Sequence, residues 1–254
     1  MLKEIIYKSL DIITAGKGIK RNINGYTLRM PTRYFKYFPE DYEKENFTFL
    51  ATCKKDDVVL DIGAHIGMFA VIASQITGQG GKVYAFEPAP GTFDLLKKTI
   101  AINAAGNVIT PLPQAVGAAV GKTTFFVSDS EADNGNSMVS YKEDRKLNGI
   151  DIDITTVDTV VKEKNLAKVN FIKIDVEGVE YDTLRGATDT LKNLRPLCIV
   201  SIHPEPIAAK GDKLEDIYDL MKGLNYKITL DGKEMSRDEF LANKEQIDLH
   251  IYPL

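Results

Sequence analysis

The chain has 254 residues, of which 44% are hydrophobic and 27% charged, which provides enough apolar side chains for the core of one compact domain. Its net charge of −4 argues against nucleic acid as a partner, because nucleic-acid-binding domains usually carry a basic surface. The two cysteines, Cys53 and Cys198, form no disulfide framework or metal motif, which favours a reducing compartment and predicts a cytoplasmic protein.

The first 14 residues predict an amphipathic helix, because their apolar side chains recur with helical spacing. Charged residues interrupt this run, so it does not resemble a signal peptide. No apolar run in the chain reaches the roughly 20 residues that span a bilayer. We expect the helix to pack on the rest of the protein, with contact to a membrane surface as the alternative.

The remainder of the first 50 residues predicts an N-terminal extension that packs on a core domain at 51–254. Asn24 and Gly25 form a turn signal that is typical of a hairpin. The aromatic cluster over 34–38 is expected to pack against the core, or to face a substrate. A helix is then predicted over 40–52.

From Asp56 onward, apolar strand-like runs alternate with helical patterns, which indicates a mainly parallel sheet covered by helices on both faces. The sequence therefore predicts an α/β fold of the doubly wound, Rossmann-like kind with a seven-stranded sheet. Strands are predicted over 57–62, 82–87, 108–112, 169–175, 197–202, 225–230 and 247–252. Helices are predicted over 67–77, 90–104, 158–165, 178–192 and 213–223.

The stretch 128–151 interrupts this alternation, after a strand-like run over 123–127. It is long and polar, and long loops in compact domains are usually functional or disordered. We expect it to be a mobile cover over the active site.

Two acidic residues mark the ends of the first two core strands. Asp61, Gly63 and Gly67 follow one apolar strand, and Glu87 ends the next. Glycines allow a tight turn from the first strand into a helix. A carboxylate at the end of the second strand, where Glu87 lies, can accept hydrogen bonds from ribose hydroxyls. A dinucleotide site usually has a third glycine, which is missing here, and Asp61 suits an amino group on the ligand instead.

Further strings follow in order: Phe86-Glu87-Pro88, the segment from Lys173 to Glu180, and Arg195-Pro196. Together with the turn after Asp61, they resemble the FkbM family of methyltransferases over roughly residues 56–204. His65 departs from the family, which usually has Asn at this position. The resemblance implies the class I methyltransferase fold, in which the last strand runs antiparallel and is inserted beside its neighbour. It also implies S-adenosylmethionine as cofactor.

The resemblance assigns a cofactor contact to each strand end. Asp61 and the turn that follows it are expected to hold the amino-acid end of the cofactor, and Glu87 the ribose. The adenosine is expected to pack on Phe86 and Pro88, the neighbours of Glu87. The adenine edge is expected to meet the segment from Gln114 to Val116. The remaining expected cofactor residues are Gly63, Ala64, His65, Ile66, Gly67, Phe86, Pro88, Gln114, Ala115 and Val116.

Three residues are candidates for the base that accepts a proton from a hydroxyl acceptor: Asp175, Glu177 and His203. His203 has an ordinary pKa near 6.5, so it can accept a proton near neutrality. Glu180 is expected to be only a first-turn partner of a helix dipole. No spacing is diagnostic of a metal site, and no metal is expected.

The sequence therefore predicts an S-adenosylmethionine-dependent enzyme that methylates a hydroxyl of a small molecule or glycan. One alternative is an NAD-dependent oxidoreductase, which also needs an acid at a strand end. A second is a non-catalytic module that keeps a cofactor-binding fold for interaction. The sequence does not indicate the oligomeric state.

Overall fold

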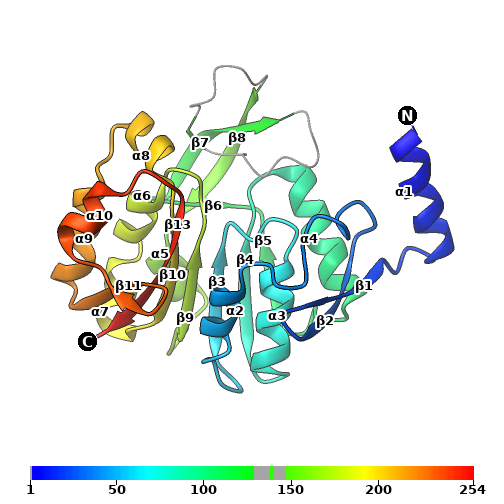
Figure 1. Cartoon of the computed structure of the whole chain (residues 1–254), viewed down its shortest axis with the longest axis horizontal. Coiled ribbons are helices and arrows are strands. Elements are labelled where there is room, and N and C mark those ends of the chain that lie inside the picture. Colours follow the sequence, from blue (N-terminus) through cyan, green and yellow to red (C-terminus); the bar gives the residue numbers. More distant parts are fainter. Residues whose placement is uncertain (1, 129–137, 140–146) are drawn as a thin grey trace.

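A computed structural model describes residues 2–128, 138–139 and 147–254. Within these residues the main sheet has eight strands in the order β12-β11-β13-β10-β9-β3-β4-β5, and it runs through the centre of the molecule (Figure 1). Its strands are β3 (Val58–Ile62), β4 (Lys82–Phe86), β5 (Ile109–Leu112), β9 (Phe171–Ile174), β10 (Leu197–Ile202), β11 (Tyr226–Leu230), β12 (Lys233–Glu234) and β13 (Ile247–Pro253).

The strand directions confirm the predicted doubly wound, mainly parallel sheet. Strands β3, β4, β5, β9 and β10 pair in parallel. Strand β13 lies between β10 and β11 and is antiparallel to both, as the resemblance implied. The predicted count of seven strands was one short, because Asp231 and Gly232 both adopt a positive φ and return the chain as the two-residue edge strand β12.

Helices cover both faces of the sheet, because its strands present apolar side chains alternately to each side. Val59 joins a cluster with α3 and α4, whereas Val58 and Leu60 join a second cluster with α5, α6, α7, α9 and α10. The helices are α1 (Leu2–Ile13), α2 (Lys44–Leu50), α3 (Met68–Thr77), α4 (Pro90–Ile102), α5 (Val157–Glu163), α6 (Glu180–Arg185), α7 (Thr188–Leu194), α8 (Pro204–Lys210), α9 (Leu214–Gly223) and α10 (Arg237–Ala242).

The N-terminal hairpin and α2 share the first of these clusters. Strands β1 (Ile19–Ile23) and β2 (Tyr26–Met30) are joined by the predicted turn at Asn24 and Gly25. Leu28 and Phe47 are buried with α3 in this cluster. Helix α2 is shorter than predicted, because Glu43 takes a left-handed conformation immediately before it.

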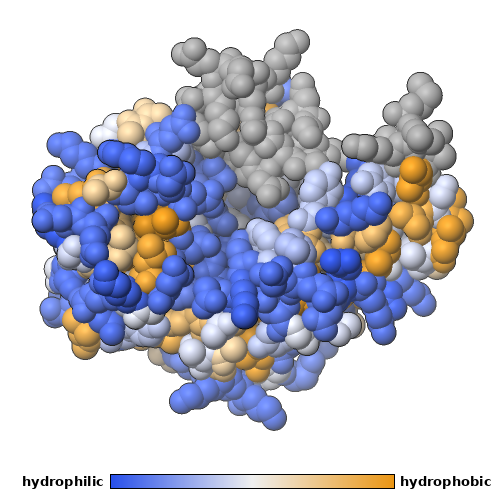
Figure 2. All heavy atoms as spheres, in the orientation of Figure 1, coloured by the Kyte–Doolittle hydropathy of each residue, from blue (hydrophilic) through white to orange (hydrophobic). Residues whose placement is uncertain are grey.

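Helix α1 differs from the expected packing. Between Ile6 and Ile13 none of its side chains is buried, and Ile12 and Ile13 are 79% and 78% exposed. In Figure 1 the helix stands at one end of the molecule, and Figure 2 shows apolar atoms gathered over it. Asp11 ties it to the body by accepting a hydrogen bond from Thr32. Among the described residues, no helix is long and apolar enough to cross a bilayer.

A three-stranded sheet corrects the predicted loop over 128–151. Strand β7 (Gly121–Ser128) pairs antiparallel with β8 (Leu147–Thr155), which also pairs with β6 (Ala115–Val116). Residues 147–151 are therefore strand, and the alternation of Ile150, Ile152 and Ile154 was the missed signal. The rest of the predicted cover falls mainly on residues 129–137 and 140–146, which lie outside the described residues.

The single helix predicted over 178–192 is two helices, α6 and α7. The chain breaks between them at Gly186, whose missing side chain makes room for the carbonyl of Gly117. A Cβ at Gly186 would lie 2.0 Å from that oxygen. Asp158 then accepts hydrogen bonds from the backbone N–H groups of Asp189 and Thr190 and so caps the second helix.

Candidate active site

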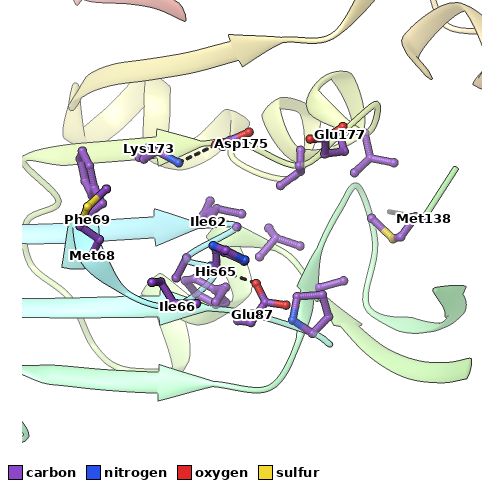
Figure 3. Close-up of a pocket in the computed structure, with 18 of the residues that line it drawn as sticks. Ile62, His65, Ile66, Met68, Phe69, Glu87, Met138, Lys173, Asp175 and Glu177 are labelled. Carbon is purple, nitrogen blue, oxygen red and sulfur yellow. Dashed lines mark hydrogen bonds and ion pairs between the residues drawn. The ribbon is translucent and has the colours of Figure 1, made fainter. Parts of the chain in front are cut away.

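A cavity of about 340 Å³ lies at the carboxyl ends of β3, β4 and β9, where ligands bind in open α/β sheets. Figure 3 shows side chains from these strands and their loops converging on it. Most of the residues predicted for the site line it: Gly63, Ala64, His65, Ile66, Phe86, Glu87, Pro88, Gln114, Ala115, Val116, Asp175 and Glu177. Asp61, Gly67 and His203 were also predicted but do not line it.

The turn after β3 places its backbone against the cavity. Gly63 and Gly67 have φ values of 82° and 86°, which only glycine adopts without strain. A Cβ at Gly63 would lie 1.9 Å from the backbone oxygen of Asp175, so this glycine makes room for the neighbouring strand end rather than for a ligand. Gly67 directly precedes α3, whose first N–H groups have no side-chain cap.

Glu87 is held at the end of β4 by two backbone N–H groups. His65 donates to Oε2 at 3.0 Å (Figure 3), and Ala89 donates to Oε1 at 2.9 Å. Burial raises the pKa of Glu87 to about 7, against the lowering effect of these two bonds. Each carboxylate oxygen has two lone pairs, so both oxygens can accept one more hydrogen bond from a ligand.

Asp61 is completely buried, and neither of its carboxylate oxygens makes a hydrogen bond of good geometry among the described residues; the backbone N–H of Ala70 lies close enough only to lower its pKa slightly. Burial raises its pKa to about 6, although nearby Lys173 opposes this shift. Unsatisfied buried carboxylates are costly, so they are usually paired or hydrogen-bonded. The environment of Asp61 therefore suits a cationic ligand group close to the turn.

Lys173 is a buried cation that the sequence analysis did not assign to the site. Its ammonium lies 2.9 Å from Oδ2 of Asp175 (Figure 3), and it lines the cavity although β9 is otherwise apolar. Burial acts to lower its pKa, but Asp175, Asp61 and Glu43 more than offset this and raise it. A charged residue inside an apolar strand was the sequence signal that could have indicated this role.

His203 lies behind the cavity wall, among three acids. Its Nδ1 is 2.6 Å from Glu180, and its Nε2 is 3.7 Å from Asp175 and 3.8 Å from Glu177. Burial alone would lower its pKa, but these carboxylates raise it to about 9. A histidine that is already protonated at neutral pH cannot accept a proton, so this geometry disfavours the predicted base role. Glu180, expected to be a helix-dipole partner, is fully buried and holds His203.

His65 lines the cavity with a nitrogen that has no partner among the described residues. Its φ is 49°, its Nε2 is buried, and burial lowers its pKa to about 4. Its ring meets that of Tyr34 edge-on at a centroid distance of 5.7 Å. The neutral ring can therefore exchange a hydrogen bond with a ligand, while the backbone N–H of the same residue holds Glu87.

Residues far from the predicted motifs complete the cavity. Phe38, Tyr42, Glu43 and Phe47 come from the N-terminal extension, and Gln246 comes from the segment before β13. Phe38 belongs to the aromatic cluster over 34–38, for which a position facing a substrate was one of the two expectations. No local pattern in the sequence marked the other four as site residues, because only the fold brings them to the ends of β3 and β9. Within the described residues, no group of three or more histidines, cysteines, aspartates and glutamates is arranged to hold a metal ion.

Comparison with known proteins relates this geometry to a family. Residues 61–228 match the family described as the methyltransferase FkbM domain. The hexuronic acid methyltransferase AglP of Haloferax volcanii is 32% identical over 200 residues, covering 78% of this chain and 75% of its own. The 31-O-demethyl-FK506 methyltransferase FkbM of Streptomyces tacrolimicus is 26% identical over 157 residues, covering 52% of this chain and 60% of its own.

A solved structure shows the same fold. The crystal structure of the methyltransferase FkbM from Methylobacillus flagellatus superposes with a TM-score of 0.51 at 19% identity and covers 79% of this chain. The match covers 44% of that protein, so this chain spans less than half its length. At 19% identity this similarity shows the arrangement of the sheet and helices alone.

Proposed function

This chain belongs to the FkbM family of methyltransferases, and from that premise we propose that it transfers a methyl group from S-adenosylmethionine to a hydroxyl oxygen of a small molecule or glycan. The observation that carries the proposal is the pair of acids beside the turn after β3. Glu87 has free lone pairs at the cavity, and Asp61 is buried behind the turn with no hydrogen-bonded partner for its carboxylate in the part of the chain that the structure describes. These are the groups that a ribose diol and an ammonium or sulfonium cation need.

The remaining cavity residues have proposed roles that follow from their positions. The backbone from Gly63 to Gly67, including His65, is proposed to hold the amino-acid end of the cofactor at the start of α3. Phe86 and Pro88 flank Glu87 and are proposed to pack on the adenosine. The other cavity residues proposed for the adenine edge are Gln114, Ala115 and Val116.

S-adenosylmethionine, when bound, supplies an electrophilic methyl group. The chain's own contribution is to orient the acceptor and to hold charges in place. Asp175 is fixed by Lys173, and although burial alone would raise its pKa, Lys173 and His203 lower it, so it stays ionised. A fixed negative charge of this kind stabilises a cation held close to it. Correct orientation of the reacting groups is a large part of catalysis in such displacements.

The proposed acceptor follows from what the relatives are named for. The Haloferax relative is named for a hexuronic acid and the Streptomyces relative for a 31-O-demethyl substrate, so the second name specifies an oxygen. Carried to this chain, both names support an oxygen acceptor on a small molecule or a glycan. We propose that the protein is cytoplasmic, because Cys53 and Cys198 are both free thiols.

A ligand panel tests the proposal. We expect S-adenosylmethionine and S-adenosylhomocysteine to raise the melting temperature of the chain and NAD to leave it unchanged. A ligand that binds only the folded state adds about 2.7 kcal/mol of stability at 100 times its Kd. Stabilisation by NAD alone would overturn the proposal and return the oxidoreductase as the better interpretation.

A further inference from the structure

The cavity has a second wall built from chain outside the family match at 61–228. The residues that suit the cofactor all lie inside that match, on β3, β4 and the segment after β5. Phe38, Tyr42, Glu43 and Gln246 lie outside it, and Tyr42 and Glu43 are close to Lys173 and Asp175. We propose that Glu43 is the catalytic base, which receives the proton of the acceptor hydroxyl. This rests on the proposed function.

Glu43 is held in a strained backbone conformation. Its φ is 45° and its ψ is 42°, a left-handed conformation that costs a residue other than glycine on the order of 1–3 kcal/mol. Glu177 and His65, also on the cavity, have φ values of 52° and 49°. Strain of this kind persists only where surrounding contacts impose it, and it concentrates at functional sites.

Side-chain contacts that hold the Glu43 carboxylate run from α2 to the C-terminal strand. The Nδ2 of buried Asn46 donates to Glu43 Oε2 at 3.2 Å and to Asp248 Oδ2 at 2.7 Å. The Oδ1 of Asn46 lies 3.0 Å from Nε2 of His250, whose ring stacks on Phe49. Asn46 therefore fixes the Glu43 carboxylate by anchoring α2 to β13.

Burial makes Glu43 a better base than an exposed glutamate, although the charges around it act in both directions. Burial raises the pKa of Glu43, whereas Lys173 and a hydrogen bond with Tyr42 lower it. Asp248 and Asp175 also raise it, and the net result is a pKa above the ordinary value of a glutamate. General bases work best when their pKa lies closer to the working pH than that of a free carboxylate. Tyr42 itself stays protonated, because burial and Glu43 raise its pKa.

The other candidates on the cavity are less suited to accept a proton. The pKa of Asp175 is lowered by Lys173 and His203. Glu177 faces the protonated ring of His203 at 3.8 Å. The pKa of His65 is lowered to about 4, and this residue belongs to the turn proposed for the cofactor.

The proposed step balances in protons and electrons. The acceptor oxygen uses a lone pair to form a bond to the methyl carbon, while the carbon–sulfur bond breaks and its electron pair stays on sulfur. The proton of the acceptor hydroxyl passes to the Glu43 carboxylate, which becomes a neutral carboxylic acid. Loss of that proton to solvent restores the base for the next turnover.

Glu43→Gln and Glu45→Gln form the test pair, because Glu45 lies on the same helix and is exposed. The probe is S-adenosylmethionine labelled in the methyl group, with a panel of neutral and uronic glycosides, alcohols, amines and thiols. We expect Glu43→Gln to lower kcat by roughly 10²–10⁴-fold. Its affinity for S-adenosylhomocysteine should stay within about twofold of the wild type, and Glu45→Gln should match the wild type in both measurements.

The pH profile provides an independent readout. The wild-type kcat should fall as the pH drops below the pKa of Glu43, and this acid limb should disappear from the residual activity of Glu43→Gln. Glu43→Asp should recover part of the lost rate. The proposal is overturned if Glu43→Gln keeps kcat within about threefold on a hydroxyl acceptor, or if its acid limb equals that of the wild type. Label that passes only to amines or thiols would instead reject the proposed hydroxyl acceptor. Failure of the wild type to bind S-adenosylhomocysteine would instead reject the proposed function.

Discussion

At the scale of a single residue, Glu87 should make cofactor affinity depend on pH. Ribose hydroxyls donate to the ionised carboxylate, and burial raises the pKa of this group to about 7. The affinity for S-adenosylhomocysteine should therefore rise as the pH increases from 6 to 8, with up to about a tenfold change per unit below pH 7. Titration calorimetry across this range measures it.

Glu87→Gln is the matched control for that measurement. It should bind roughly 10–100-fold more weakly, equivalent to about 1.5–3 kcal/mol for hydrogen bonds to a charged group. Its affinity should lack the step near pH 7, leaving only the contribution of Asp61, whose pKa is about 6. An unchanged step in the variant would assign the titration to another residue.

His203 should stabilise the fold more at low pH than at high pH. Its folded pKa of about 9 lies above its ordinary value of 6.5, so its stabilising contribution is complete below pH 6.5 and is lost as the pH rises through 9. His203→Gln should lower the free energy of unfolding by at most about 3 kcal/mol at pH 6 and by much less at pH 9.5. Urea unfolding at both pH values measures the difference.

Turnover of the same variant separates structural support from proton acceptance. If His203 only holds Glu180 and the neighbouring acids, turnover per folded molecule should stay near normal once an acceptor is known. A loss of 10²–10⁴-fold in turnover, with stability unchanged, would restore the base role inferred from sequence.

At the scale of single elements, two glycines form a matched pair. A Cβ at Gly63 would lie 1.9 Å from the Asp175 carbonyl and the backbone has a φ of 82°, so Gly63→Ala should destabilise by more than about 2 kcal/mol. Gly91, in the first turn of α4, has no heavy atom within 4 Å of a Cβ and no positive φ. Gly91→Ala should stabilise by about 0.5–1 kcal/mol.

Urea unfolding curves of the two variants measure this difference directly. Similar free energies of unfolding for both would mean that the turn after β3 relaxes to accept a side chain. In that case the close approach of the strand ends would not be a rigid feature of the site.

The elements show which patterns predict structure and which do not. The parallel strands were predictable because they are short apolar runs, and Asp61 and Glu87 because strand ends meet at one edge of a sheet. The antiparallel β8 was missed because its polar neighbours suggested a loop. The break between α6 and α7 depends on Gly117, a residue distant in sequence, so a helical pattern alone could not indicate it.

The same limit applies to the candidate site. Glycines and acids at strand ends form local patterns, whereas Tyr42, Glu43 and Gln246 join the cavity only through long-range packing. His203 had the pattern of a base, because the sequence does not show that Glu180 lies 2.6 Å away. The positions of the strand-end residues were therefore predictable and their protonation states were not, and their roles stay predictions.

At the scale of the whole molecule, truncation distinguishes α1 from the rest of the extension. Asp11 connects this helix to the buried Thr32 by a hydrogen bond, of a kind that contributes about 0.5–1.5 kcal/mol, and to the partly exposed Lys98 by an ion pair, of a kind that contributes about 0–1 kcal/mol. Removal of residues 1–16 should change the free energy of unfolding by less than about 1–2 kcal/mol and leave the affinity for S-adenosylhomocysteine within twofold.

Removal of residues 1–50 is the contrasting variant. It takes Leu28, Phe47 and Leu50 out of a buried cluster, and each fully buried side chain of this size contributes about 1.5–3 kcal/mol. This variant should lose cooperative unfolding, as measured by circular dichroism during heating. A cooperative transition equal to that of the full chain would show that the core does not need the extension.

The division of the cavity between two parts of the chain has an evolutionary consequence. Substitutions at Phe38 in the N-terminal extension or at Gln246 before β13 alter one wall while Glu43, the turn after β3 and Glu87 stay unchanged. If the turn after β3 and Glu87 hold the methyl donor, as proposed, descendants of one ancestor can acquire new acceptors while that site remains under constant selection. Exchange of these flanking segments between paralogues should transfer acceptor preference from one enzyme to another.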